Sequence, residues 1–346
     1  MIMLDRSGSL SLTVATGVAA VSAIVSVLWF HSSSDGARAG ISSNPRSPPS
    51  WTHEEKALMA AAVGVNPPAQ VPRRWLPLIS KSFRWTLRFC HALDPLPNSF
   101  LCLQCLWWKA IAANDANSPA YDHGLMYDML PSYSRIIVSE PLVRFWPRLL
   151  HANVEIRTAF LDRAIRRIKT ATPKRTKLLL VTLGGGYDIR SIKMMQLGLV
   201  YRAAELDLPE VVQAKQALLE KRFHKRRPQL QLPLLVESDL NQVDSVEQTL
   251  RNQVLSQSDE PMVTIFLFEA VFLYLEKGVP TALLKMCSRM ARPGDWLILV
   301  DRIEGVTADN KEEVARVLRE CQWELMEFLP KAGATRHMVR ARLLVE

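Results

Sequence analysis

Acidic side chains and a run of glycines stand where the strands of an alternating pattern are expected to end. Residues 178–188 read Leu-Leu-Leu-Val-Thr-Leu-Gly-Gly-Gly-Tyr-Asp, an apolar run that stops at three glycines and an aspartate. Glycines allow a backbone to turn sharply and to approach a bulky ligand closely. Asp207 stands twenty-three residues after Gly184, near the spacing at which nucleotide-binding folds place an acid on ribose hydroxyls. This combination predicts a nucleoside-like ligand.

Three further side chains could contribute to the same site. Asp239 follows a third predicted strand, and Glu269 ends a fourth, strongly apolar one, where an ionised carboxylate is costly unless it has a partner. Arg157 projects from the apolar stripe of a predicted helix, where its guanidinium either reaches water or binds a ligand carboxylate. Each residue has a structural explanation of its own, as a cap, a loop residue or a strand end. Their occurrence at successive strand ends predicts one ligand site.

The ligand class follows from what the glycine run lacks. A dinucleotide-binding fingerprint needs a glycine at position 189, which is Ile189, and the Gly-Lys-Ser/Thr of a phosphate-binding loop does not occur. S-adenosylmethionine has no phosphates but has a ribose diol, an adenine and an amino-acid end. We therefore expect S-adenosylmethionine, and no metal.

The elements that must position these residues alternate between strand and helix. The predicted strands are 177–183, 201–206, 233–236, 262–268 and 296–302, and the predicted helices between and before them are 151–168, 188–197 and 209–222. Asp188 is a plausible N-cap of its helix, and Pro209 lies in the first turn of the next. This order predicts an α/β fold with a doubly wound, mostly parallel sheet, whose ligand binds outside the carboxyl ends of the strands.

The motifs together resemble the leucine carboxyl methyltransferase family, within the Rossmann-like class I S-adenosylmethionine-dependent methyltransferases. The resemblance covers roughly residues 115–305. It rests on segments similar to the family's Leu-Gly-x-Gly-x-Asp, Glu-Val-Asp-Phe-Pro, Asp-Leu and Glu-Cys-Val-Leu-x-Tyr motifs and its arginine-bearing helix: Leu183–Asp188, Glu205–Lys215, Ser238–Leu240, Glu269–Tyr274 and Arg157–Leu161.

The resemblance also implies roles for individual residues. Arg157 would hold the cofactor carboxylate, and Gly184 and Gly186 would line its methionine end. Asp207 would bind the ribose. Asp239 and Leu240 would contact the adenine, Glu269 the cofactor ammonium, and Tyr274 would approach the methyl acceptor. No catalytic residue is named, because methyl transfer to a carboxylate needs no general base and can rest on proximity and orientation.

Two departures from the family pattern bear on function. The family has a lysine that also contacts the cofactor carboxylate, and the corresponding position here is Ala120, so either binding is weaker or another cation compensates. Only about twenty residues separate Arg302 from the closing segment 323–345, where the eukaryotic phosphatase-directed members carry a long insertion. This second departure argues against a C-terminal leucine as the substrate.

The N-terminal part has a different character. No charged residue occurs from Gly8 to Phe30, and about 20 apolar residues span a bilayer core. Residues 1–39 are therefore predicted to be a transmembrane anchor, with a cleaved signal or targeting peptide as the alternative. Residues 40–74 are predicted to be a Pro/Ser-rich linker, residues 75–150 a helical cap region that packs on the catalytic domain or lies on a membrane surface, and residues 151–346 the methyltransferase domain.

Composition limits the remaining function classes. The chain of 346 residues is 48% hydrophobic and carries a net charge of +9, but no nucleic-acid-binding module accompanies the basic cluster 221–227. Five cysteines are too few for a disulfide framework, and Cys102 and Cys105 form a lone pair without further zinc ligands. We expect an O-methyltransferase acting on a carboxyl group of a protein or small acid. The alternative is a non-catalytic, membrane-tethered interaction module.

Overall fold

The structure is a computed structural model that describes residues 76–93, 100–114, 120–122, 124–138, 152–224, 229–256, 262–306, 310–329 and 337–345. All of them belong to one compact unit, 49–346. The predicted anchor and linker lie outside the described residues. Within the described part, no helix has both the length and the apolar character needed to cross a bilayer.

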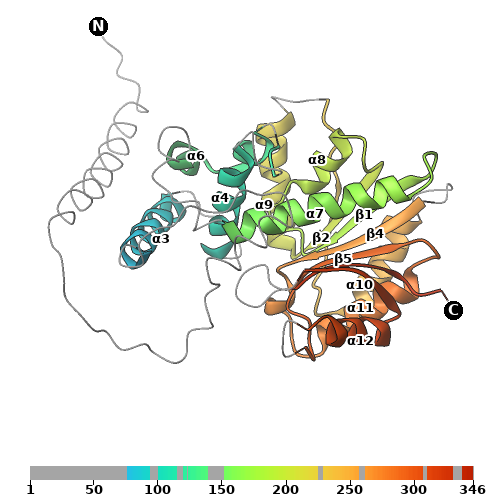
Figure 1. Cartoon of the computed structure of the whole chain (residues 1–346). Helices are drawn as coiled ribbons and strands as arrows, with labels where there is room; N and C mark the ends of the chain where they lie inside the picture. The colour runs from blue at the N-terminus through green and yellow to red at the C-terminus, as the bar shows by residue number, and fades with distance from the viewer. Residues whose placement is uncertain are drawn as a thin grey trace, which may run out of the picture. The chain divides into compact units, whose positions relative to one another are not determined.

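The larger part of the described chain is built on a seven-stranded sheet with the order β3-β2-β1-β4-β5-β7-β6 (Figure 1). The strands from β1 to β5 are parallel neighbours, whereas β7 is antiparallel to both β5 and β6. Their bounds are β1 (Lys177–Leu183), β2 (Arg202–Asp207), β3 (Leu234–Glu237), β4 (Met262–Glu269), β5 (Trp296–Asp301), β6 (Trp323–Leu329) and β7 (His337–Leu343). The mixed α/β fold with a mostly parallel sheet is therefore confirmed.

Helices cover both faces of this sheet. They are α7 (Ala152–Ala171), α8 (Arg190–Gln196), α9 (Pro209–Leu218), which continues into the π-helical η3 (Leu219–His224), α10 (Val243–Thr249), which continues into the π-helical η4 (Leu250–Leu255), the 3-10 turn η5 (Phe272–Tyr274), α11 (Val279–Met290) and α12 (Lys311–Glu320). One core layer joins the sheet to α7 and α8, and the other joins it to α10, α11 and α12.

The two layers follow from the alternation of side chains along each strand. In β1, Leu178 and Leu180 pack toward α7 and α8, whereas Leu179 and Val181 belong to the layer with α10–α12. All four are at most 2% exposed, as expected for a parallel strand buried on both faces. The long apolar run in the sequence therefore forms a central strand that is buried on both faces of the sheet.

A group of helices precedes the sheet and packs beside its first helix. It comprises α3 (Leu76–Leu93), α4 (Phe100–Asn114), α5 (Leu125–Met129) and α6 (Ser132–Val138). Helix α4 packs on α7, and α3 packs on α4 (Figure 1). The ring of Phe83 on α3 contacts Trp107 and Trp108 on α4, at centroid distances of 5.6 and 6.1 Å. These contacts bring a cationic side chain of α4 to the carboxyl edge of the sheet.

Candidate cofactor site

The glycine run forms the loop that leaves β1. Gly184 and Gly186 have φ of +77° and +49°, in the left-handed region that disfavours residues with a Cβ. A Cβ on Gly184 would lie 2.5 Å from Val271 Cγ2, so this glycine is required by space as well as by backbone angle. Around Gly186 nothing lies within 4 Å of an added Cβ. The loop is thus tightly packed at its start and open at its third glycine.

Asp207 holds this loop from the end of β2. Its Oδ2 accepts a hydrogen bond from the Gly186 amide at 2.6 Å, and its Oδ1 accepts one from Leu208 N at 2.8 Å. Burial raises the pKa of the Asp207 carboxyl, and the two backbone amides oppose that shift. The structure therefore brings Asp207 and Gly186 together, as the sequence predicted for a ribose-binding acid beside the glycine loop.

Glu269, at the end of β4, has the cationic partners that its apolar strand required. Lys109 Nζ lies 2.8 Å and Arg190 Nη2 3.0 Å from its Oε2, and Arg157 Nη2 lies 3.4 Å from its Oε1. Burial alone would raise the pKa of Glu269, but the positive charges of Lys109, Arg190 and Arg157 outweigh it and hold the pKa below its ordinary value. Glu269 is therefore ionised at neutral pH.

Asp188 has a different role from the predicted helix cap. Helix α8 begins at Arg190, its N-cap position is Ile189, and no side chain caps it. Asp188 Oδ1 accepts from Arg190 N at 3.1 Å, while its Oδ2 lies 2.8 Å from Lys109 Nζ and 3.1 Å from Arg190 Nη2. Asp188 is therefore not the predicted N-cap residue, although its Oδ1 still binds the first amide of α8 while its Oδ2 binds the two cations.

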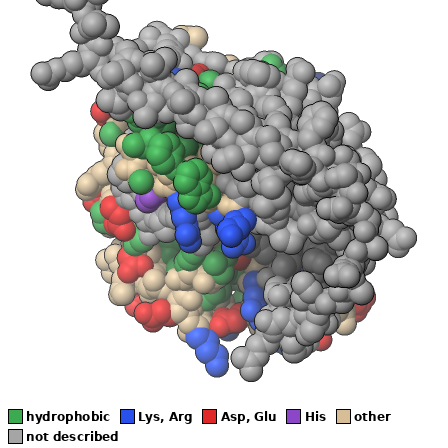
Figure 2. Space-filling view, turned by 90° about the vertical axis from the view of Figure 1, so that its left-hand side faces the viewer, with side chains coloured by type: hydrophobic (Ala, Val, Ile, Leu, Met, Phe, Trp, Pro, Cys, Tyr) green, Lys and Arg blue, Asp and Glu red, His purple; other side chains and the backbone are tan. Residues whose placement is uncertain are grey.

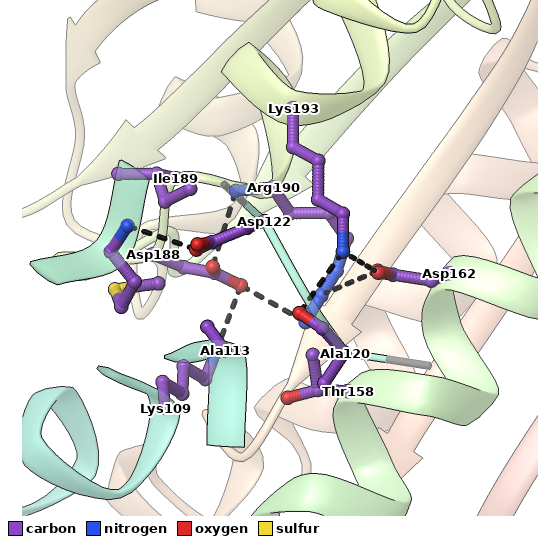
Figure 3. Close-up of a pocket in the computed structure, with 11 residues that line it drawn as sticks. Lys109, Ala113, Ala120, Asp122, Thr158, Asp162, Asp188, Ile189, Arg190 and Lys193 are labelled. Atoms are coloured by element: carbon purple, nitrogen blue, oxygen red, sulfur yellow. Dashed lines mark hydrogen bonds and ion pairs between the residues drawn. The ribbon is translucent and has the colours of Figure 1, made fainter. Parts of the chain in front are cut away.

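The sequence did not single out Lys109 or Arg190. Lys109 projects from α4 toward Asp188, which follows β1 (Figure 3). Its Nζ also donates to Glu269, which ends β4. It is the only charged residue in the α4 segment FLCLQCLWWKAIAAN, and a single cation in a helix without other charges was the available signal. Lys109 also lines the same small pocket as Ala120, the position that the resemblance assigns to the family lysine.

A second ion pair extends the cluster behind Arg190. Lys193 Nζ lies 2.6 Å from Asp162 Oδ2 and donates to the Ala120 carbonyl at 3.2 Å, and Arg190 Nη1 lies 3.6 Å from Asp162 Oδ1. These ion pairs join into one network of four cations and three carboxylates, with one more positive than negative charge among its members. The members are Lys109, Arg157, Arg190, Lys193, Asp162, Asp188 and Glu269.

Several donors of this network are buried without a hydrogen bond in the described structure. They are Arg157 Nε and Arg190 Nε and Nη1, and the acceptors Asp162 Oδ1 and Glu269 Oε1 of the network also lack a hydrogen bond, as does the neighbouring Thr158 Oγ1. Buried polar groups are normally satisfied by protein, water or ligand. The adjoining pocket, of about 20 Å³, has room for about one water molecule. Unsatisfied guanidinium donors beside an excess positive charge are suited to a carboxylate.

A buried pair beneath the loop keeps the glycines in place. Lys215 of α9 donates to Glu205 of β2 and to the carbonyl of Asp188, and both side chains of this pair are almost fully buried. A Cβ on Gly185 would lie 2.9 Å from Glu205 Oε2, so the second glycine is needed for this packing. The Glu205–Lys215 pair thus connects β2, α9 and the loop after β1.

The remaining predicted residues lie on the loops that follow β3 and β4. Asp239 is exposed and its Oδ1 accepts from Asn241 N at 2.9 Å, whereas Leu240 is 5% exposed and packs in the core. Tyr274 is 58% exposed at the end of η5. The Glu276 amide donates to Asn241 Oδ1 at 3.0 Å, which joins the two loops. Adenine and acceptor contacts at these residues stay predictions.

Asp301 is another residue that sequence reasoning missed. It ends β5, is fully buried, and its Oδ2 accepts from the amides of Val271 at 2.5 Å and Phe272 at 2.7 Å. Ala270, between them and Glu269, has a φ of +58°. Non-glycine residues adopt this conformation rarely and at a cost of order 1 kcal/mol. Asp301 therefore stabilises the turn that directs the chain away from Glu269.

Asp122 gives the site a titratable group near neutral pH. Its carboxylate accepts from Gly124 N at 3.0 Å and Met126 N at 2.9 Å, yet burial raises its pKa to about 7 from the ordinary 3.8. Between pH 3.8 and about 7 the folded chain binds more protons than the unfolded chain. The free energy of unfolding therefore falls as pH rises, by up to about 1.4 kcal/mol per pH unit.

Asp122→Asn should remove that dependence. Urea denaturation between pH 5 and 8 should give a shallower pH slope for this variant than for the parent, while Asp244→Asn, at an exposed carboxyl on α10, keeps the parent slope. Parallel curves for the parent and Asp122→Asn would contradict the raised pKa.

Among the residues described, no group of three or more His, Cys, Asp and Glu side chains is placed to hold a metal ion. Cys105 is a free, partly buried thiol, and the side chain of Cys102 lies outside the described residues.

The fold and the site together define a class of protein. The strand order with an antiparallel β7, the glycine loop after β1 and the acids that end β2 and β4 are those of a class I S-adenosylmethionine-dependent methyltransferase. Residues 128–288 match the family model described as leucine carboxyl methyltransferase. This segment is just under half of the chain, and over it the sequence is similar to that family. The chain is an S-adenosylmethionine-dependent methyltransferase.

Solved structures with a related fold are distant. Magnesium protoporphyrin IX methyltransferase from Synechocystis, with bound S-adenosylmethionine, is 13% identical, with 55% of this chain and 84% of that chain covered and a TM-score of 0.35. A methyltransferase from Thermobifida fusca is 13% identical, with 70% and 94% covered and a TM-score of 0.39. An O-methyltransferase family 2 protein from Planctomyces limnophilus, in complex with apigenin, is 12% identical, with 80% and 98% covered and a TM-score of 0.36. No curated protein sequence matches the chain.

Proposed function

We propose that the chain transfers the methyl group of S-adenosylmethionine to a carboxylate of a protein or a small acid. The observation that carries the proposal is the buried network around Glu269, in which an ionised carboxylate and unsatisfied guanidinium donors lie side by side. The amino-acid end of the cofactor needs both an anion for its ammonium and cations for its carboxylate.

The residues present fit the cofactor in three respects. Glu269 would bind the ammonium, and Arg157 and Arg190 would bind the carboxylate through guanidinium donors that make no hydrogen bond in the described structure. Gly184 and Gly186 would allow close approach of the methionine end, and Asp207 would bind the ribose. When bound, S-adenosylmethionine supplies an activated methyl group on a sulfonium, a leaving group that needs no protonation.

The protein then has mainly to orient the methyl group and the acceptor and to exclude water from the site. A carboxylate acceptor is nucleophilic without deprotonation, so no general base is needed and positioning can supply the rate enhancement. The exposed Leu273 and Tyr274 follow Glu269 on η5, and we propose that they contact the acceptor. The rigid Asp301 turn would hold both at a fixed place relative to Glu269.

Lys109 is proposed to complete the cofactor site in place of the family lysine missing at Ala120. A cofactor ammonium bound to Glu269 would compete with Lys109, whose own ammonium is the same chemical group. Lys109 would then be free to contact the carboxylate of the same ligand. It also supplies the excess positive charge of the network, so it favours an incoming anion.

Lys109→Met keeps the aliphatic chain and removes the charge. We expect this variant to bind S-adenosylhomocysteine about tenfold or more weakly, which corresponds to about 1.4 kcal/mol, while methylthioadenosine, which lacks the amino-acid end, keeps its affinity. Isothermal titration calorimetry measures both. Lys285→Met, at an exposed position on α11, is the matched control. Equal losses for the two ligands would contradict a role at the amino-acid end.

To test the reaction, the protein is incubated with radiolabelled S-adenosylmethionine in an extract of the cells from which it comes, and the labelled products are then treated with mild base. A methyl ester releases its label as methanol under base, and this is the expected result. Base-stable label would refute carboxyl methylation. Calorimetry that showed no binding of S-adenosylhomocysteine by folded protein would overturn the cofactor assignment. Binding without any transfer would support the alternative, a non-catalytic interaction module.

A further inference from the structure

Helix α3 has two apolar faces, and within the described part of the chain only one of them packs on another helix. Phe83, Leu87 and Cys90 are at most 2% exposed, and the first of these packs on the tryptophans of α4. Trp85, Phe89 and Leu93 point away from that interface.

The second face is a continuous stripe of large side chains. Trp85, Phe89 and Leu93 follow one another at intervals of four residues and are 62%, 44% and 39% exposed. The rings of Trp85 and Phe89 stack on each other at a centroid distance of 6.3 Å. Single exposed apolar residues are common, but an aligned stripe of three indicates a binding surface.

Cations lie along one side of this stripe. Lys81, Arg84 and Arg88 are exposed on adjoining turns of α3, and the helix contains no acidic residue. Figure 2 looks onto the side of the molecule on which α3 lies in Figure 1, and there hydrophobic side chains gather directly beside Lys and Arg side chains. Aromatic residues with adjoining cations are the pattern of helices that lie in the interface of a bilayer.

We infer that α3 lies on a membrane surface that carries anionic lipid headgroups, with Trp85, Phe89 and Leu93 inserted among the lipids. Each Lys or Arg near such a surface adds electrostatic attraction to the anionic headgroups, and the inserted side chains add the free energy of apolar burial. A second copy of the chain fits the surface less well, because two stripes facing each other would bring two acid-free helices together.

The inference is independent of the proposed methyl acceptor and of the predicted N-terminal anchor. If residues 10–30 do enter a membrane, the anchor holds the chain near the bilayer and α3 determines which surface faces it. A test must therefore report on α3 itself and not only on whether the chain binds vesicles.

Hydroxyl-radical footprinting of the full chain provides such a readout. Labelling of Trp85 and Phe89 is measured by mass spectrometry with vesicles of phosphatidylcholine alone and with vesicles that contain about one-third phosphatidylserine. We expect labelling of both side chains to fall several-fold on the anionic vesicles and to recover at high salt. Leu197 and Met326, which are 43% and 47% exposed on other elements, serve as internal controls and should keep their labelling.

A variant with reversed charges on α3 provides the second part of the footprinting experiment. Lys81→Glu with Arg84→Glu should abolish the protection of Trp85 on anionic vesicles while leaving affinity for S-adenosylhomocysteine unchanged, which shows that the variant is folded. Unchanged labelling of Trp85 on vesicles, whether or not the chain binds them, would overturn the inference. Protection that appears without lipid as protein concentration rises would also overturn it, since it would assign the stripe to self-association.

Discussion

A chain carrying Glu269→Gln is expected to lose about 3 to 5 kcal/mol of its free energy of unfolding and to lose measurable affinity for S-adenosylhomocysteine. Removing one partner of a buried ion pair leaves the other charge uncompensated, and here Lys109, Arg157 and Arg190 all lose their shared anion. Chemical denaturation measures the first effect and calorimetry the second.

A control variant and a double variant test whether the loss comes from the ion pairs of Glu269. Glu237→Gln changes an exposed carboxylate at the end of β3, on the edge of the sheet, where its partner is Gln213, and should cost little. The double variant Lys109→Met with Glu269→Gln should be more stable than the sum of the two single losses predicts, because it removes a cation together with its anion. Strictly additive losses would show that Lys109 and Glu269 do not interact.

The second large effect is expected at Gly184. Gly184→Ala must place a Cβ within 2.5 Å of Val271 Cγ2 at a φ of +77°, so strain and overpacking act together. We expect a loss of roughly 2 to 5 kcal/mol in the free energy of unfolding, or failure to fold.

Gly186→Ala separates the two causes. This position also has a positive φ but open space around an added Cβ, so only the backbone penalty of about 1 to 2 kcal/mol applies. Thermal and urea denaturation of both variants provide the comparison. If the two alanine variants are equally stable, the contact between the loop and Val271 contributes nothing.

The sheet was predictable because its strands are bounded by clear signals. The apolar run of β1 ends at the glycines, and the structure has the predicted bounds 177–183. Asp207 and Glu269 fall at the last residues of β2 and β4, so the edge that gathers them follows from parallel strands alone. The C-terminal β6 and β7 were not separated in advance, because an antiparallel pair at the end of an alternating pattern has no helix between its strands.

The cations of the site were harder to predict than its acids. Lys109 lies 79 residues from Asp188 and 160 from Glu269, and no local pattern predicts a contact over such separations. Arg190 and Lys193 belong to a short helix that is buried almost throughout, where burial of charge depends on partners contributed by α7. Asp188 shows the same limit, because the contact with the Arg190 amide is local whereas the ion pair with Lys109 is not.

Because Lys109 lies outside the segment that matches the family model, that segment is not expected to form a self-sufficient folding unit. The matched segment 128–288 contains Glu269 and Asp188 but not the α4 lysine that neutralises them, nor the strand that carries Asp301. A fragment cut at the family boundaries would bury two carboxylates with one fewer cation and would lack three strands of the sheet. Domain transplantation or fragment expression should therefore begin before α3 and continue through β7.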